Sequence, residues 1–159
     1  QLAANGAEIL VRVSAYMDPW NATAPMDWWT VINRARAIEN MAYVVAANQA
    51  ASLRHYPPYS WSGGSQIVDF EGRLLADASP GPGERIVVAP VDISALRHER
   101  GTRRGHHMLA HLRTEAYPVY QNHLYPPQSE NAEAGEHLSY EKNNELIDEA
   151  KRRVDARDF

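Results

Sequence analysis

Residues 28–47 read WWTVINRARAIENMAYVVAA and join a helix-type pattern directly to a strand-type pattern. In the first part, apolar residues recur at spacings of three and four, as on one face of an α-helix. These residues are Trp28, Val31, Ile32, Ala35, Ile38 and Ala42. The second part, Tyr43 to Ala47, is continuously apolar, as in a strand covered on both faces of its sheet. The stretch predicts a helix, capped by Asp27 or Thr23, that is followed at once by a buried strand.

The flanking segments add further strands to this unit. Residues 8–13 are β-rich, and Glu71-Gly72 separates two strand-like runs that form a hairpin, with glycine suited to the turn. After a Pro/Gly loop comes another β-rich run. The sequence therefore predicts an α/β fold with strands at 8–13, 43–48, 64–70, 73–77 and 85–91, and one long helix between the first two.

The last third of the chain has a different character. From Arg97 onward it is charged, His-rich and interrupted by Pro, without the sustained apolar pattern of a second core. Near the end, Ile147, Ala150 and Val154 share one face of a helical pattern. We expect one domain over residues 1–100 and an extended C-terminal arm over 101–159 that carries a short terminal helix.

Composition excludes several classes of function. The 159 residues are 44% hydrophobic, which suffices for one core, and their net charge of -4 gives no cationic field for nucleic acid. No apolar run approaches the roughly 20 residues that span a bilayer. We therefore expect no nucleic-acid or membrane partner and a cytoplasmic protein. The chain contains no Cys and cannot supply a thiol nucleophile.

Two motif-like groups point to ordinary structure instead of chemistry. His107 and His111 are four residues apart, but they lack the carboxylate of an HExxH metal motif, so we expect neither metal nor cofactor. Ser65 and Asp69 could formally join a His in a hydrolase triad. The sequence lacks the GxSxG elbow that exposes such a serine, which argues against this alternative.

Glu39 and Asn48 are polar residues beside the predicted buried strand. Glu39 lies in a helical run with Arg34 and Arg36, which favours an ion-pairing role over acid–base chemistry. Asn48 ends the predicted strand, where an amide side chain commonly anchors a turn or loop. Both are interpreted as structural residues.

Three ordered stretches resemble the second half of the nitrilase superfamily, whose members hydrolyse nitriles, amides and N-carbamoyl compounds. The first, Leu2 to Leu10, is similar to the helix end and strand after the nucleophile. The second, Arg34 to Asn48, is similar to a helix-to-strand segment, and the third, Gly64 to Gly72, to a late hairpin. The resemblance covers Leu2 to about Arg100, and its three motifs agree with the strands and helix inferred above.

The resemblance implies a four-layer αββα sandwich, of which this chain supplies half. Half a sandwich leaves an apolar sheet face bare, and such a surface normally marks an interface. We therefore expect a partner, either the missing N-terminal half or a second subunit, and a homo-oligomer in solution.

The family's chemistry uses a Cys nucleophile, a Glu base, a Lys and a supporting Glu, all N-terminal to the part resembled here. No catalytic residue is therefore assigned to this chain. The loop after the first strand resembles a substrate-binding segment and consists of Ser14, Ala15, Tyr16 and Met17. Tyr16 is the foremost substrate contact in this interpretation; the alternatives are that Tyr16 packs under the loop and that Ser14 bonds only local backbone.

Two hypotheses for function follow. In the first, the chain is the C-terminal portion of a carbon-nitrogen hydrolase that acts through a Cys thioester, with a small amide as substrate in preference to a nitrile or N-carbamoyl compound. In the second, it is a noncatalytic binding or assembly module derived from that fold. Both predict that the chain alone is inactive.

Overall fold

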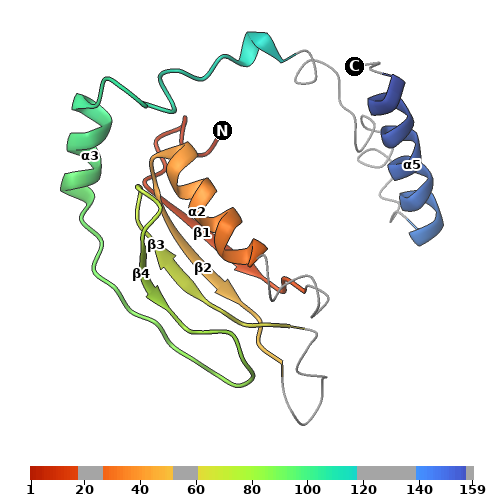
Figure 1. The fold of residues 1–159 in the computed structure, drawn as a ribbon, viewed down its shortest axis with the longest axis horizontal. Coiled ribbons are helices and arrows are strands. Elements are labelled where there is room, and N and C mark those ends of the chain that lie inside the picture. The colour runs from red at the N-terminus through yellow and green to blue at the C-terminus, as the bar shows by residue number, and fades with distance from the viewer. Residues whose placement is uncertain (18–26, 52–60, 118–138, 157–159) are drawn as a thin grey trace. The chain divides into compact units, whose positions relative to one another are not determined.

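The computed structural model describes residues 1–17, 27–51, 61–117 and 139–156, and the chain divides into two compact units, Gln1–His111 and Leu112–Phe159. The first unit contains one sheet whose strands lie in chain order (Figure 1). Strands β1 and β2 pair in parallel, and β3 and β4 continue the sheet in antiparallel fashion. The strands span Ile9–Ser14, Tyr43–Asn48, Gln66–Val68 and Leu74–Asp77.

These strands confirm four of the five predicted segments, with one clear difference in length. Strand β3 ends at Val68, short of the predicted 64–70, because Asp69 begins the hairpin turn. The Asp69 carboxylate accepts hydrogen bonds from the backbone N–H groups of Glu71 (2.9 Å) and Arg73 (2.8 Å). Gly72 has a φ of 81°, the left-handed conformation expected of the glycine in this turn.

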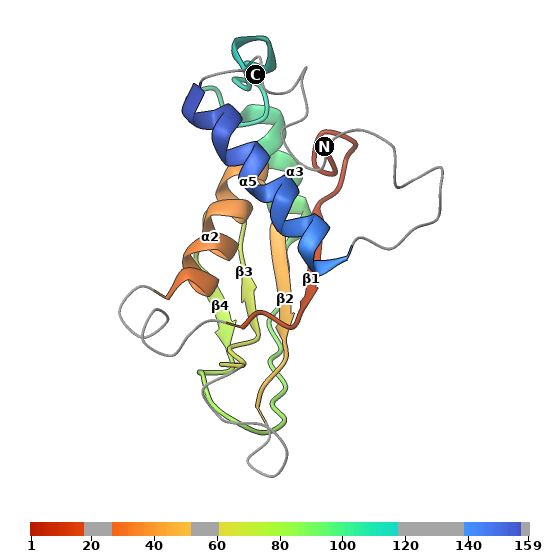
Figure 2. The same ribbon diagram turned by 90° about the vertical axis from the view of Figure 1, so that its right-hand side faces the viewer.

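Helix α2, Trp28–Asn40, connects β1 to β2 in the chain and lies against one face of the sheet (Figure 2). The long predicted helix is thus confirmed. The Asp27 side chain caps its first turn by accepting from the Thr30 N–H at 3.3 Å, while Thr23 lies outside the described residues. The core beneath the helix is formed by Trp29, Ala37, Val44, Ala46 and Val68.

The predicted apolar stripe of α2 is not the face that packs on the sheet. Trp28, Val31 and Ile38 are 47%, 57% and 40% exposed, whereas the buried positions are Trp29, Asn33 and Ala37. Asn33 turns inward because its side-chain oxygen accepts a hydrogen bond from Arg12 of β1 at 2.9 Å. The helix is apolar on two sides, and periodicity alone does not choose between them.

The face of β1 that points away from α2 is open to solvent. Ile9, Val11 and Val13 alternate with residues that face the helix, and they are 39%, 69% and 83% exposed. A row of exposed β-branched residues on one face of a strand is unusual for a folded domain, even though β1 is the edge strand of the sheet. One face of the sheet is therefore covered by α2, and the β1 part of the other face is bare.

Residues 85–91, predicted to be a strand, are not a strand in the structure. They form no ladder with any described strand, and Ile86 and Val88 are 92% and 84% exposed. The alternating apolar pattern is typical of a strand, but a strand also needs a neighbour with free backbone groups. Within the described residues this neighbour is missing, and the prediction was wrong.

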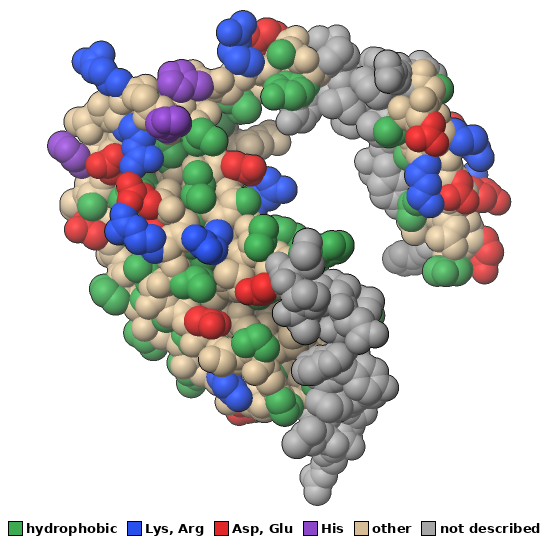
Figure 3. Space-filling model, in the orientation of Figure 1, with side chains coloured by type: hydrophobic (Ala, Val, Ile, Leu, Met, Phe, Trp, Pro, Cys, Tyr) green, Lys and Arg blue, Asp and Glu red, His purple; other side chains and the backbone are tan. Residues whose placement is uncertain are grey.

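A helix that the sequence did not predict, α3 at Ile93–Thr102, packs at the amino ends of β1 and β2. Leu96 is fully buried, and the Tyr43 hydroxyl bonds to the backbone of Asp92, whose side chain caps the helix. Arg100 donates to the carbonyls of Met41 (2.8 Å) and Ala7 (2.7 Å). Figure 3 shows charged side chains of both signs gathered over this helix. The fold is closed at this end by α3.

The second unit contains η1, Thr114–Ala116, and helix α5, Tyr140–Ala156. Helix α5 confirms the predicted terminal helix, although its 17 residues make it longer than expected. The proposed division after residue 100 stays a prediction, and α3 runs across it. No helix in the described part of the chain is long and apolar enough to cross a membrane.

Candidate functional site

The candidate site lies where the parallel strands β1 and β2 both end. Ser14 and Asn48 are the last residues of these strands and are paired in register. The Gln49 N–H donates to the Ser14 carbonyl at 2.9 Å and holds the ends of the two strands together. Open α/β sheets bind ligands just beyond the carboxyl ends of their parallel strands. This edge is therefore the place to look for a ligand site.

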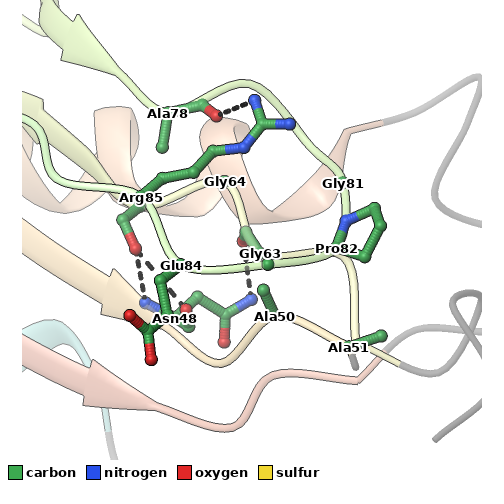
Figure 4. A pocket seen from close by; sticks show the side chains of 12 residues that line it. Asn48, Ala50, Ala51, Gly63, Gly64, Ala78, Gly81, Pro82, Glu84 and Arg85 are labelled. Atoms are coloured by element: carbon green, nitrogen blue, oxygen red, sulfur yellow. Dashed lines mark hydrogen bonds between the residues drawn. The ribbon is translucent and has the colours of Figure 1, made fainter. Parts of the chain in front are cut away.

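A hollow of about 730 Å³ opens beside this edge (Figure 4). It is lined by the segments that leave β2, enter β3 and follow β4, and most of its wall is glycine, alanine or backbone. Its size falls within the range of small-molecule pockets. The polar side chains in its wall are Asn48, Ser65, Glu84 and Arg85.

Asn48 connects the hollow to the loop after β1. Its side-chain oxygen accepts from the Tyr16 N–H at 2.8 Å, and its Nδ2 donates to the carbonyls of Gly63 (2.8 Å) and Tyr16 (3.3 Å). The Asn48 N–H in turn donates to the Ser65 hydroxyl at 3.1 Å. The predicted role of Asn48 as a loop anchor is confirmed.

The Tyr16 ring stacks on a buried tryptophan. Its centroid lies 5.3 Å from that of Trp29, and the Arg12 guanidinium lies 4.4 Å from the Trp29 ring on the same face of the sheet. The Trp29 indole N–H donates to the Gly64 carbonyl at 2.7 Å. Sequence reasoning missed Trp29 and Gly64, because no local pattern connects residues 35 positions apart.

The four predicted substrate-binding residues form one short segment at this edge. Ser14 ends β1 and is half-buried, Ala15 and Met17 are exposed, and Tyr16 is half-buried. None of these four residues lines the hollow, but Asn48, which does, accepts a hydrogen bond from the Tyr16 N–H. A substrate role for Ser14, Ala15, Tyr16 and Met17 stays a prediction.

The other sequence candidates have structural partners. Glu39 forms the predicted ion pair, with Arg36 of its own helix at 2.6 Å, while Arg34 ties the helix to the hairpin through the Gly72 carbonyl. Ser65 and Asp69 are both engaged in backbone hydrogen bonds.

His107 has partners at both ring nitrogens. Nε2 lies 2.9 Å from the Arg100 carbonyl, and Nδ1 accepts from the Ala110 N–H at 3.1 Å. With Nδ1 as the acceptor, Nε2 is the ring nitrogen that donates to the Arg100 carbonyl. Among the described residues, no group of three or more His, Asp and Glu side chains is arranged to hold a metal.

Electrostatic perturbation is concentrated away from the hollow, around α3. The hydrogen bond from Arg97 lowers the pKa of Glu8, and the same contact raises the pKa of Arg97. Burial lowers the pKa of Arg100, and the charge of Glu8 opposes that effect. These groups stabilise the amino end of the sheet and lie outside the candidate site.

The family model for carbon-nitrogen hydrolases matches residues 1–100. The chain belongs to the carbon-nitrogen hydrolase family. It is 42% identical to human deaminated glutathione amidase over 99 residues, an alignment that covers 62% of this chain and 28% of that protein. It is 33% identical over 98 residues to omega-amidase NIT3 of Saccharomyces cerevisiae, with coverage of 62% and 31%.

Solved structures agree with this assignment. The chain aligns to S. cerevisiae Nit3, a member of branch 10 of the nitrilase superfamily, with a TM-score of 0.52 and 29% identity, covering 65% of this chain and 35% of that one. The nitrilase-superfamily resemblance is confirmed, and the α/β fold corresponds to part of an αββα sandwich. The chain spans 28% to 35% of the length of these relatives.

Proposed function

We propose that this chain is the C-terminal portion of an amidase that cleaves a non-peptide C–N bond through a Cys thioester. The observation that carries the proposal is the match to amidases over the whole sheet-forming part of the chain. An amide is favoured over a nitrile or N-carbamoyl substrate because both curated relatives are amidases by name. The 159 residues contain no Cys, so the nucleophile and its Glu and Lys partners belong to a segment outside this chain.

In this mechanism the general base takes the thiol proton, and the thiolate adds to the amide carbonyl. The same group then returns the proton to the leaving nitrogen, so that ammonia departs and a thioester remains. A water molecule, deprotonated by the general base, then adds to the thioester, which frees the carboxylic acid and restores the thiol. The part assigned to this chain is the wall of the substrate site, with the Ser14–Met17 loop beside the nucleophile.

The bare face of β1 supports the need for a partner. At about 25 cal/mol per Å², leaving several hundred Å² of apolar sheet in water forfeits on the order of 10 kcal/mol, comparable to the net stability of a domain. Val11 and Val13, 69% and 83% exposed, are the residues to be covered. We assign this role to the N-terminal portion of the hydrolase and expect the assembled protein to be a homo-oligomer.

Ammonia release tests the proposal. The chain alone and the assembled protein that contains it are each given an amide, a nitrile and an N-carbamoyl compound of equal carbon number. We expect turnover of the amide by the assembled protein and none by the chain alone. Turnover by the purified chain that is lost when one of its own residues is changed would overturn the assignment. An inactive assembled protein would favour the noncatalytic module.

A further inference from the structure

The backbone of Tyr16 is fastened by a single side chain. Asn48 accepts from the Tyr16 N–H at 2.8 Å and donates to the Tyr16 carbonyl at 3.3 Å, while the same Nδ2 donates to the Gly63 carbonyl at 2.8 Å. The amide orientation is fixed by this network, because a flip would set Nδ2 against an N–H donor and the oxygen against two carbonyls. The carboxamide therefore joins the β1 loop to Gly63.

The ring of Tyr16 is fastened independently. It stacks on Trp29 with a centroid distance of 5.3 Å and an interplanar angle of 29°. Trp29 is only 3% exposed, and its N–H bonds to the Gly64 carbonyl at 2.7 Å. An aromatic pair of this geometry contributes about 0.5–1.5 kcal/mol beyond its buried area. The attachment through Trp29 thus ends on Gly64, and the attachment through Asn48 ends on the adjacent residue, Gly63.

The Gly63–Gly64 turn on which both attachments end is also a wall of the hollow (Figure 4). The φ angles of these residues are 70° and 72°, in the left-handed region that favours glycine. A Cβ on Gly63 would lie 3.1 Å from the Gly81 carbonyl oxygen, and one on Gly64 would lie 3.6 Å from the Trp29 ring. The turn is therefore closely packed on both sides, and its carbonyls are well placed to act as fixed points.

We infer that Trp29 and Asn48 are positioning residues that fasten Tyr16 to the Gly63–Gly64 turn and thereby set the acyl-side specificity of the site. The inference rests on the proposed function, since it takes Tyr16 as a substrate contact. Neither attachment involves the nucleophile, which lies outside this chain. Loosening Tyr16 should therefore weaken the binding and selection of the acyl group more than it slows bond cleavage.

The test uses two conservative substitutions in the assembled protein. Trp29→Phe keeps a stacking ring but removes the N–H that reaches Gly64, and Asn48→Asp keeps the acceptor for the Tyr16 N–H but removes both donated bonds. Acetamide and butyramide are the probes. We expect the KM for butyramide to rise about tenfold in Trp29→Phe, as for the loss of one good hydrogen bond, and at least as much in Asn48→Asp, which loses two donated bonds. In both variants kcat should stay within about threefold of wild type.

Matched controls for both substitutions come from α2, the helix that contains Trp29. Trp28→Phe changes a neighbouring tryptophan that is 47% exposed, and Asn40→Asp changes a half-buried residue whose side-chain amide donates to the Arg36 carbonyl. Both controls should keep the butyramide-to-acetamide ratio of kcat/KM within about twofold of wild type, since neither touches Tyr16. If kcat and kcat/KM fall together in the positioning variants while that ratio is unchanged, the specificity role is refuted.

Hydrogen exchange at the Tyr16 amide gives a readout that needs no activity. Asn48→Ala removes the acceptor of this N–H and should speed its exchange at least about tenfold, whereas Asn48→Asp should leave it protected. Unchanged exchange in Asn48→Ala would refute the attachment itself. If the two variants show this difference in exchange but the wild-type protein releases no ammonia from either amide, the proposed function is refuted and the attachment stands.

Discussion

Replacing Arg100 by Met should destabilise the sheet-containing unit more than replacing any other charged residue of α3. Arg100 donates to Met41 and Ala7 carbonyls at 2.8 and 2.7 Å and to the Asn40 carbonyl at 3.3 Å. Two of these acceptors lie at the C-terminus of α2, where carbonyls lack intrahelical partners and the helix dipole favours a cation.

The magnitude follows from these contacts. A hydrogen bond to a charged group is worth about 1.5–3 kcal/mol, and Arg100 is half-buried, so water partly replaces what is lost. We expect a loss of about 2–4 kcal/mol, equivalent to a fall in Tm of about 8–16 °C for a unit of this size. Thermal unfolding of the assembled protein, followed by circular dichroism at fixed protein concentration, measures the change in Tm.

The matched control is Arg104→Met, an exposed arginine just after α3. Arg100→Lys keeps the charge but not the planar fork and should lie between the two. A Tm for Arg100→Met within about 2 °C of the Arg104→Met value would show that α3 does not hold the ends of α2 and β1.

Three further outcomes are expected. Gly64→Ala should cost about 1–2 kcal/mol in a urea titration, because Gly64 has a φ of 72°. The bond from Arg97 lowers the pKa of Glu8 below its ordinary 4.5, so its stabilisation is present above pH 4.5 and lost as the pH falls through the lowered value. Glu8→Gln should flatten the acid-side fall in Tm, and an unchanged profile would refute this linkage. Tyr43→Phe removes both hydroxyl bonds to Asp92 and should cost about 1–2 kcal/mol in the same titration.

Local sequence was sufficient wherever the neighbour of an element was close in the chain. The strand at 43–48 is predicted with its observed bounds because its apolar run is bordered by a helix end and a polar loop. The hairpin is predicted because Glu71-Gly72 separates two strand-like runs, and the structure adds the Asp69 hydrogen bonds that shorten β3.

Elements that depend on distant partners were not predictable in this way. Residues 85–91 have a strand composition, but pairing is decided by whether another backbone lies alongside, and the pattern contains no information on that. Helix α3 carried a local signal, the Asp92 cap, which was obscured because this residue directly follows the predicted strand. The inward face of α2 was set by the Arg12–Asn33 bond, which joins residues 21 positions apart.

For the candidate site, the sequence predicted which segment contributes to it but not how the side chains of that segment are held. The Ser14–Met17 loop lies at the carboxyl edge of the parallel strands, where a ligand site is expected. The attachment of Tyr16 to Trp29 and, through Asn48, to Gly63 could not be inferred from spacing, since it depends on how segments far apart in the chain meet.

Light scattering of the 17.9 kDa chain at micromolar concentration tests most directly the claim that its bare sheet face needs a partner. We predict that the chain alone is either associated or lacks a cooperative unfolding transition, and that an N-terminal segment carrying Glu, Lys and Cys converts it into a defined assembly. A compact monomer of 17.9 kDa that unfolds cooperatively on its own would contradict the account, because Val11 and Val13 would then be stable in water without cover.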